Sequence, residues 1–138
     1  HGGKAYAEAH KADIARHVLA AESDFGAGRV WQLRTRFGAG REAYAKDLAE
    51  ALRPLGVGPG NTEAFGGADV GALRAAGVPV LDLAQDGSDY FDLHHTANDT
   101  LDKIDPAALK QNVAAWAVML YLASEMQGGF RTVEAAAP

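Results

Sequence analysis

The fold class is decided by residues 18–28, which read Val18-Leu19-Ala20-Ala21-Glu22-Ser23-Asp24-Phe25-Gly26-Ala27-Gly28. A short apolar run followed by acidic side chains and glycine is typical of a buried strand that ends in a loop. In open α/β sheets, ligands bind at such strand ends. We therefore expect a buried strand at residues 18–21 and a functional loop that contains Asp24.

Helical and strand-like patterns alternate along the rest of the chain. Asp105 is a good N-cap and Pro106 suits the first position of a helix, so a long helix is expected to begin there and to end at Gly128. Apolar spacing predicts further helices at 41–53 and 70–76, and strands at 30–37 and 78–83, the strand at 30–37 being less buried than the first. This alternation predicts an α/β sandwich at residues 1–127, followed by a flexible tail at 128–138.

Composition limits the classes of function. The chain has 138 residues, of which 48% are hydrophobic and 22% charged, as in globular domains with one core. The net charge is -5 and the basic residues are scattered, so no nucleic-acid partner is expected. No apolar run is long enough to span a bilayer, so no membrane partner is expected either. Because cysteine is absent, a metal ion would need His and carboxylate ligands.

The densest group of reactive side chains lies between Asp86 and Thr100. His94 and His95 stand there beside several acids, which suits zinc ligands, although His-His pairs also occur as ordinary loop residues. Glu22 and Asp24 would point to the same side of a strand and could form a carboxylate pair, or Asp24 could simply cap a turn. None of the serines lies in a nucleophile elbow, so metal-activated water is the remaining hydrolytic chemistry.

Four segments resemble the dizinc aminopeptidase family of clan MH metallopeptidases, which includes bacterial leucyl aminopeptidases and plasma glutamate carboxypeptidase. They follow the order and spacing of that family, and they are Ala21-Glu22-Ser23-Asp24-Phe25-Gly26, Gly66-Gly67-Ala68-Asp69, Gly77-Val78-Pro79 and His94-His95-Thr96-Ala97-Asn98-Asp99-Thr100. The resemblance covers nearly the whole chain, and its most specific element is the His-Thr-x-x-Asp-Thr pattern.

The resemblance implies a role for individual residues. Asp24 and His95 match ligands of two different zinc ions, and Asp99 matches a residue that supports the ligands. The general-base glutamate and the other ligands of the family come earlier in the polypeptide and are not in this chain. Gly67 and Asp69 match the family's loop beside the substrate pocket, although Val70 replaces a histidine often found after that aspartate. Tyr90 and Phe91 could form a wall of that pocket or pack in the core.

The resemblance also implies a fold and an activity. The fold is a three-layer α/β/α sandwich with a mixed, mainly parallel sheet, of which this chain is the carboxy-terminal half. The intact protein is expected to be a periplasmic or extracellular exopeptidase that hydrolyses peptides with two zinc ions, and this chain alone to be inactive. Apolar surface left by the missing half should favour self-association or pairing with that half.

Two other functions share this fold. A catalytically silent domain of the transferrin-receptor-like branch would bind protein partners, but it would have no need to keep both Asp24 and His95. A glutaminyl cyclase would use one zinc ion for an intramolecular acyl transfer.

Overall fold

The computed structural model describes residues 1–132. Its elements are the helices α1 (Gly2–Ala9), α2 (Glu42–Leu52), α3 (Gly71–Ala75), α4 (Tyr90–Leu93) and α5 (Pro106–Glu125), the short 3-10 helices η1 (Lys11–Arg16), η2 (Arg53–Leu55) and η3 (Leu101–Lys103), and the strands β1 (Val30–Arg36), β2 (Gly58–Pro59) and β3 (Val80–Gln85). The helices and strands predicted between residues 30 and 125 are therefore present, with slightly different bounds.

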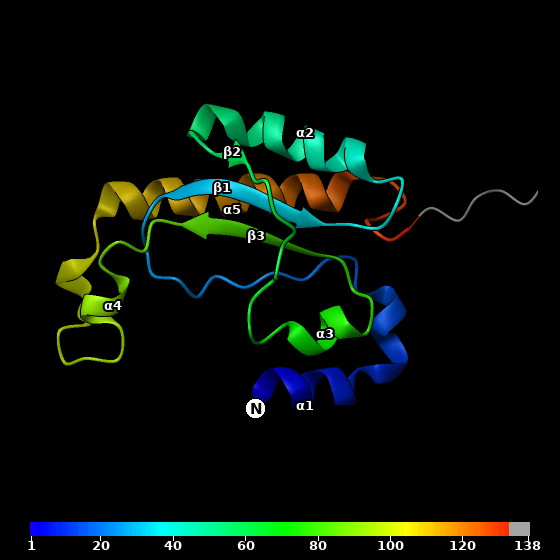
Figure 1. Ribbon diagram of the computed structural model, residues 1–138, viewed down its shortest axis with the longest axis horizontal. Helices are drawn as coiled ribbons and strands as arrows, with labels where there is room; N and C mark the ends of the chain where they lie inside the picture. The colour runs from blue at the N-terminus through cyan, green and yellow to red at the C-terminus, as the bar shows by residue number, and fades with distance from the viewer. Residues whose placement is uncertain (133–138) are drawn as a thin grey trace, which may run out of the picture.

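The strands form one mixed sheet in the order β2-β1-β3 (Figure 1). Strand β1 is antiparallel to β3, with Arg36 opposite Val80 and Val30 opposite Gln85, and a bulge lies between Val30 and Gln32. Strand β1 is parallel to the short β2. The expected α/β fold with a mixed sheet is confirmed, although the longest ladder in this chain is the antiparallel one.

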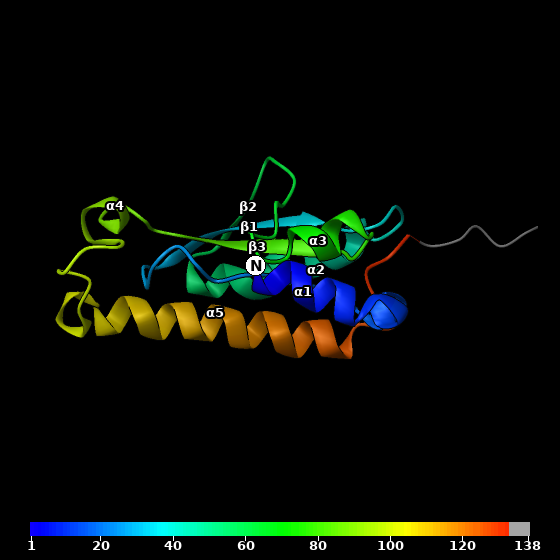
Figure 2. The same cartoon turned by 90° about the horizontal axis from the view of Figure 1, so that it is seen from below.

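Helices α2 and α5 cover one face of the sheet and form the main core with it. Figure 2 shows α5 running along that face. Leu48 and Leu52 of α2 are fully buried against the strands, together with Met119 of α5. A second cluster joins Ala20, Leu73 and Val80 beneath α1 and α3. These two clusters hold both ends of the sheet at defined positions.

The predicted strand at residues 18–21 does not form. The segment makes a single parallel bridge, between Ala20 and Val80, and Val18 is 52% exposed. Ala20 donates to the carbonyl of Pro79 and accepts from the amide of Leu81, so its only ladder neighbour among residues 1–132 is β3. A single bridge is not a ladder of hydrogen bonds, so this segment is extended without forming a regular strand. Consequently β1 is more buried than this segment, the reverse of our expectation.

The outer side of α5 is apolar but exposed. Apart from Met119, its buried residues are small or polar, among them Ala115 and Gln111, whereas Val113 and Leu120 are 58% and 61% exposed. Trp116 is partly buried and Tyr121 is exposed. A helix that is apolar all round is usually buried on all sides. No helix among residues 1–132 has the length and apolar character needed to cross a membrane.

Residues 128–132 differ from the flexible tail that we expected. Phe130 is fully buried against Phe37 and Tyr44. Arg131 donates to the carbonyls of Ile14, His17 and Gly77, and so ties the end of the chain to η1 and to the loop after α3. The rest of the expected tail, residues 133–138, lies outside the described part of the chain.

Candidate functional site

The segment after η1 and strand β3 run in the same direction and end at the same side of the molecule. In Figure 1 that segment lies below β3, and both lead toward α4. The parallel bridge between Ala20 and Val80 aligns them. As a result, Asp24, which follows the segment, and the loop that carries α4 are on the same side of the sheet.

A column of aromatic rings connects Asp24 with the histidine pair. The ring of Phe25 stacks on Tyr90 at a centroid distance of 4.3 Å, and Tyr90 stacks on His94 at 4.5 Å. His94 in turn stacks on His95 at 3.7 Å. Because Phe25 is the neighbour of Asp24, the column connects two segments that are 71 positions apart in sequence and places Asp24 and His95 at the same end of the sheet.

The electrostatics of Tyr90 indicate the same proximity. Its pKa is raised above the usual 10.0 by desolvation, and then by the negative charges of Asp24 and Asp99. A carboxylate raises the pKa of a phenol only when it lies nearby. The charges of both carboxylates thus act on the Tyr90 hydroxyl, while the Tyr90 ring stacks on His94. Asp24, Tyr90, Asp99 and His95, four of the six predicted site residues, lie at this end of the sheet.

His95 has an unusual backbone conformation. Its φ is 58°, and it is the only residue other than glycine with positive φ among residues 1–132. Two hydrogen bonds close the turn around His95. The amide of His94 donates to the carbonyl of Tyr90, and the amide of Thr96 donates to the carbonyl of Leu93. Residues other than glycine adopt such angles at a cost, and they cluster at functional sites.

The side chains of Asp24 and His95 are available to an external ligand. Within residues 1–132 neither side chain makes a hydrogen bond or an ion pair to another residue, and both are exposed. A carboxylate oxygen and an imidazole nitrogen are donors that zinc accepts. No three His, Asp or Glu side chains in the described part of the chain lie close enough together to hold a metal ion. The donors present thus fit zinc chemically but do not complete a site.

Gly67 and Asp69 lie in a second loop that two carboxylates hold. The Glu22 carboxylate accepts from the amide of Asp69 at 2.8 Å, and it fills the space that a side chain at residue 67 would need. Asp82 of β3 accepts from the amides of Phe65 and Gly66. Glu22 is therefore occupied by this loop, and the carboxylate pair with Asp24 that the spacing allowed does not form.

The two groups of predicted residues are separate. The loop of Gly67 and Asp69 lies against α1, where a side chain at Gly3 would overlap the backbone of Asp69. No hydrogen bond or ring contact within residues 1–132 joins this loop to Tyr90 or His95. In Figure 1 the loop before α3 and helix α4 lie apart. Phe91, considered as a pocket wall or a core residue, is 77% exposed and therefore not in the core.

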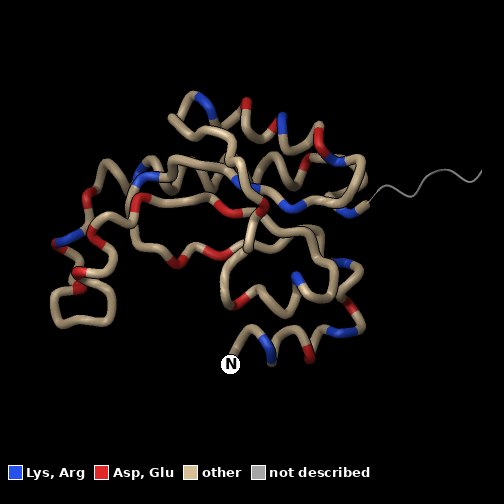
Figure 3. Tube along the Cα trace, in the orientation of Figure 1, with Lys and Arg blue, Asp and Glu red and all other residues tan. Residues whose placement is uncertain are grey.

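Acidic positions surround the candidate site. Figure 3 shows red stretches in the segment after η1 and in the loops on both sides of α4. The pKa of Asp86 lies below its usual 3.8 because the hydroxyl and the amide of Ser88 both donate to its carboxylate. Such a concentration of negative charge attracts cations to this end of the sheet.

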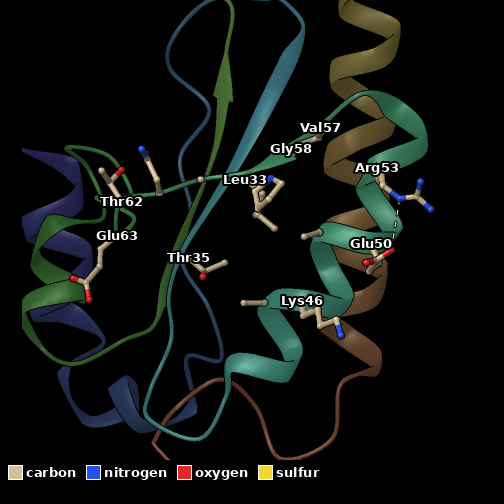
Figure 4. A pocket seen from close by; sticks show the side chains of 14 residues that line it. Leu33, Thr35, Lys46, Glu50, Arg53, Val57, Gly58, Thr62 and Glu63 are labelled. Atoms are coloured by element: carbon tan, nitrogen blue, oxygen red, sulfur yellow. Dashed lines mark ion pairs between the residues drawn. The ribbon is translucent and has the colours of Figure 1, made fainter.

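A large groove lies elsewhere. It has a volume of ≈ 880 Å³ between α2 and the loop that contains β2, as Figure 4 shows. Leu33, Thr35 and Val57 contribute to its lining, and Glu50 is paired with Arg53 at its rim. None of the residues that the sequence assigned to a site lines this groove.

Sequence reasoning missed the polar residues that hold the two loops. Asp82 and Gln85 interrupt an apolar strand, which was the available signal, because a polar side chain in a buried strand needs a partner. Their partners, the amides of residues 25, 65 and 66, are distant in sequence and could not be identified from it.

Comparison with known proteins shows consistent similarity. The model of peptidase family M28 matches residues 1–120. The chain is 32% identical to carboxypeptidase Q of Rattus norvegicus and 30% identical to that of Homo sapiens, over 91% of this chain and 26% of each relative. It is 47% identical to the crystal structure of a peptidase M28 precursor from Shewanella amazonensis SB2B, with a TM-score of 0.90 over 98% of this chain and 30% of that one. The chain thus spans about a quarter of the length of these curated relatives.

Proposed function

Because the chain belongs to peptidase family M28, we propose that it is part of a longer zinc-dependent exopeptidase and supplies Asp24 and His95 to its metal centre. The observation that supports this proposal is the ring column from Phe25 to His95, which links the segment of Asp24 to the histidine loop at one end of the sheet, where both side chains have free donor atoms. The similarity to carboxypeptidases supports a peptide substrate.

Each residue has a defined role in this proposal. Asp24 and His95 each hold one of two zinc ions, and Asp99 lies close enough to support them electrostatically. Two zinc ions would polarise the scissile carbonyl and lower the pKa of a bound water. One ligand per ion does not replace the hydration shell, so this chain alone binds zinc weakly and is inactive. The remaining ligands and the general base come from the rest of the longer protein.

The test uses the intact protein. Release of amino acids from peptides should be lost on treatment with a chelator and restored by zinc, but not by calcium. Peptidase activity that is insensitive to chelators would contradict the proposal. An intact protein that neither binds zinc nor hydrolyses peptides would favour the silent binding domain, and formation of amino-terminal pyroglutamate would favour the cyclase.

We further propose that the apolar side of α5 is covered by another part of the longer protein. Val18, Trp116 and Leu120 line a groove between α5 and the segment after η1, and the indole Nε1 of Trp116 is buried without an acceptor among residues 1–132. Exposed apolar patches of this kind mark interfaces. The chain expressed alone should therefore form dimers in light scattering at micromolar concentration, and Leu120→Ser should weaken them. A monodisperse monomer would contradict this.

A further inference from the structure

Gln85 makes two hydrogen bonds to the turn that follows Asp24. It ends β3 and is only 7% exposed. Its Oε1 accepts from the amide of Phe25 at 3.3 Å, and its Nε2 donates to the carbonyl of Gly26 at 2.7 Å. A side-chain amide that satisfies one donor and one acceptor of the same turn holds that turn in one orientation.

The turn after Asp24 and the loop after Gln85 are also packed closely against each other. A side chain at Gly87 would overlap the ring of Phe25, and one at Gly28 would overlap the backbone of Asp86. The amide of Asp86 additionally donates to the carbonyl of Arg29 at 2.8 Å. Movement of the turn after Asp24 therefore requires movement of the loop after Gln85, and Gln85 lies where these two segments meet.

Through these contacts, Gln85 is linked to both proposed ligands, Asp24 and His95. Gln85 holds the backbone of Phe25, directly after Asp24, and the ring of Phe25 begins the stack that ends at His95. We infer that Gln85 is a positioning residue that sets the separation of Asp24 and His95 before metal binds. This inference rests on the proposed function, because it concerns the same metal centre.

A second buried glutamine offers a matched comparison. Gln111 of α5 is 9% exposed; its Oε1 accepts from the amide of Val30 at 2.9 Å, and its Nε2 donates to the carbonyls of Val30 and Leu55 at 2.8 and 2.9 Å. It therefore has the same chemistry and similar burial, but it contacts neither Asp24's turn nor the histidine loop. Gln111→Leu removes the same kind of buried bonds as Gln85→Leu without touching either proposed ligand.

The experiment compares Gln85→Leu and Gln111→Leu in the intact protein. Zinc affinity is measured by competition with a chromophoric chelator, and the visible spectrum of the cobalt-substituted protein reports ligand geometry. Loss of a hydrogen-bonding partner behind a ligand typically costs about 10–100-fold in metal affinity. We expect a weakening of that size and an altered cobalt spectrum for Gln85→Leu only. If Gln85→Leu does not fold, Gln85→Glu is measured instead. It keeps the size of the side chain and the acceptor for the amide of Phe25, so it should weaken zinc affinity less.

The outcomes separate this inference from the proposed function. Equal zinc affinities and equal cobalt spectra for the Gln85 variants and Gln111→Leu, with a wild type that binds zinc, would overturn the positioning role and leave the proposed function intact. A wild type that binds no zinc and shows no chelator-sensitive activity would overturn both. A weakening confined to the Gln85 variants, with thermal stability close to that of Gln111→Leu, supports the inference.

Discussion

The two ends of β3 differ: one packs in the core, and the other leads to the exposed loop that carries His95. Leu81 and Leu83 point into the core beneath α2 and α5 and are 0% and 4% exposed. Beyond Gln85 the chain is mostly exposed, makes a strained turn at His95 and leaves donor atoms free. Burial in the core stabilises the fold. Part of this stability offsets the strain at the α4 end, where His95 has an unfavourable backbone angle. Substitutions at the two ends should therefore separate activity from stability.

The largest expected effect is that of Asp24→Asn on activity. An amide binds zinc far less well than a carboxylate, so peptidase activity of the intact protein should fall by more than the roughly 100-fold caused by loss of an outer partner. Thermal stability should hardly change, because Asp24 is exposed and unbonded. Asp92→Asn, with the same charge change on exposed α4, is the control and should retain activity. Equal activities of the two variants would remove Asp24 from the metal centre.

The second-largest expected effect is a loss of stability caused by a substitution in the core. Leu48 is fully buried beneath the sheet, so Leu48→Ala should lower the free energy of unfolding by about 2–5 kcal/mol through lost burial and a cavity. Urea unfolding measures this change, with Leu101→Ala, at a site 83% exposed, expected within about 0.5 kcal/mol of wild type. Activity per folded molecule should be unchanged. A catalytic defect in the folded Leu48→Ala protein would show that the two ends are coupled.

His95→Gly tests the strain at the α4 end. Glycine relieves a positive φ worth about 1–2 kcal/mol, but it adds freedom to the unfolded chain worth about 0.5–1 kcal/mol. The metal-free variant should thus be as stable as wild type or slightly more stable, while its activity is lost. His94 has φ -50°, so His94→Gly gains no such relief and should be destabilised. Urea unfolding of both metal-free variants distinguishes these results, and a clear loss of stability in His95→Gly would argue against strain.

The smallest effect concerns the turn at Asp86. Hydrogen bonds from Ser88 lower the pKa of Asp86 in the folded protein, so their stabilising contribution is present above pH 3.8 and is lost as the pH falls through the lowered value. Ser88→Ala removes the hydroxyl bond and should raise the pKa of Asp86 toward its usual value. Titration followed by carbon NMR at the Asp86 carboxyl measures this. An unchanged pKa would mean that the backbone bond from residue 88 is sufficient.

Local patterns predicted helices α2, α3 and α5 and the two longer strands correctly, but they did not predict the short helix α4 or the short strand β2. Asp105 does cap α5 by accepting from the amide of Ala107, and Leu48 and Leu52 of α2 are buried as their spacing indicated. The strand at residues 18–21 failed for a reason that local pattern cannot contain. An apolar run becomes a strand only where a neighbour bonds it along its length, and within residues 1–132 this run makes a single bridge, at Ala20.

The sequence by itself determined which chemistry is available: no cysteine, no serine elbow, and acids and histidines at the ends of predicted elements. It also supported the family resemblance, since short motifs keep their order and spacing. Only the tertiary structure decided that Phe25, Tyr90 and His94 connect Asp24 to His95, that Glu22 holds the loop of Asp69 instead, and that Gln85 holds the turn after Asp24. The contacts between distant segments join residues 47 to 65 positions apart, and such pairings arise from packing of the whole sheet rather than from local preference.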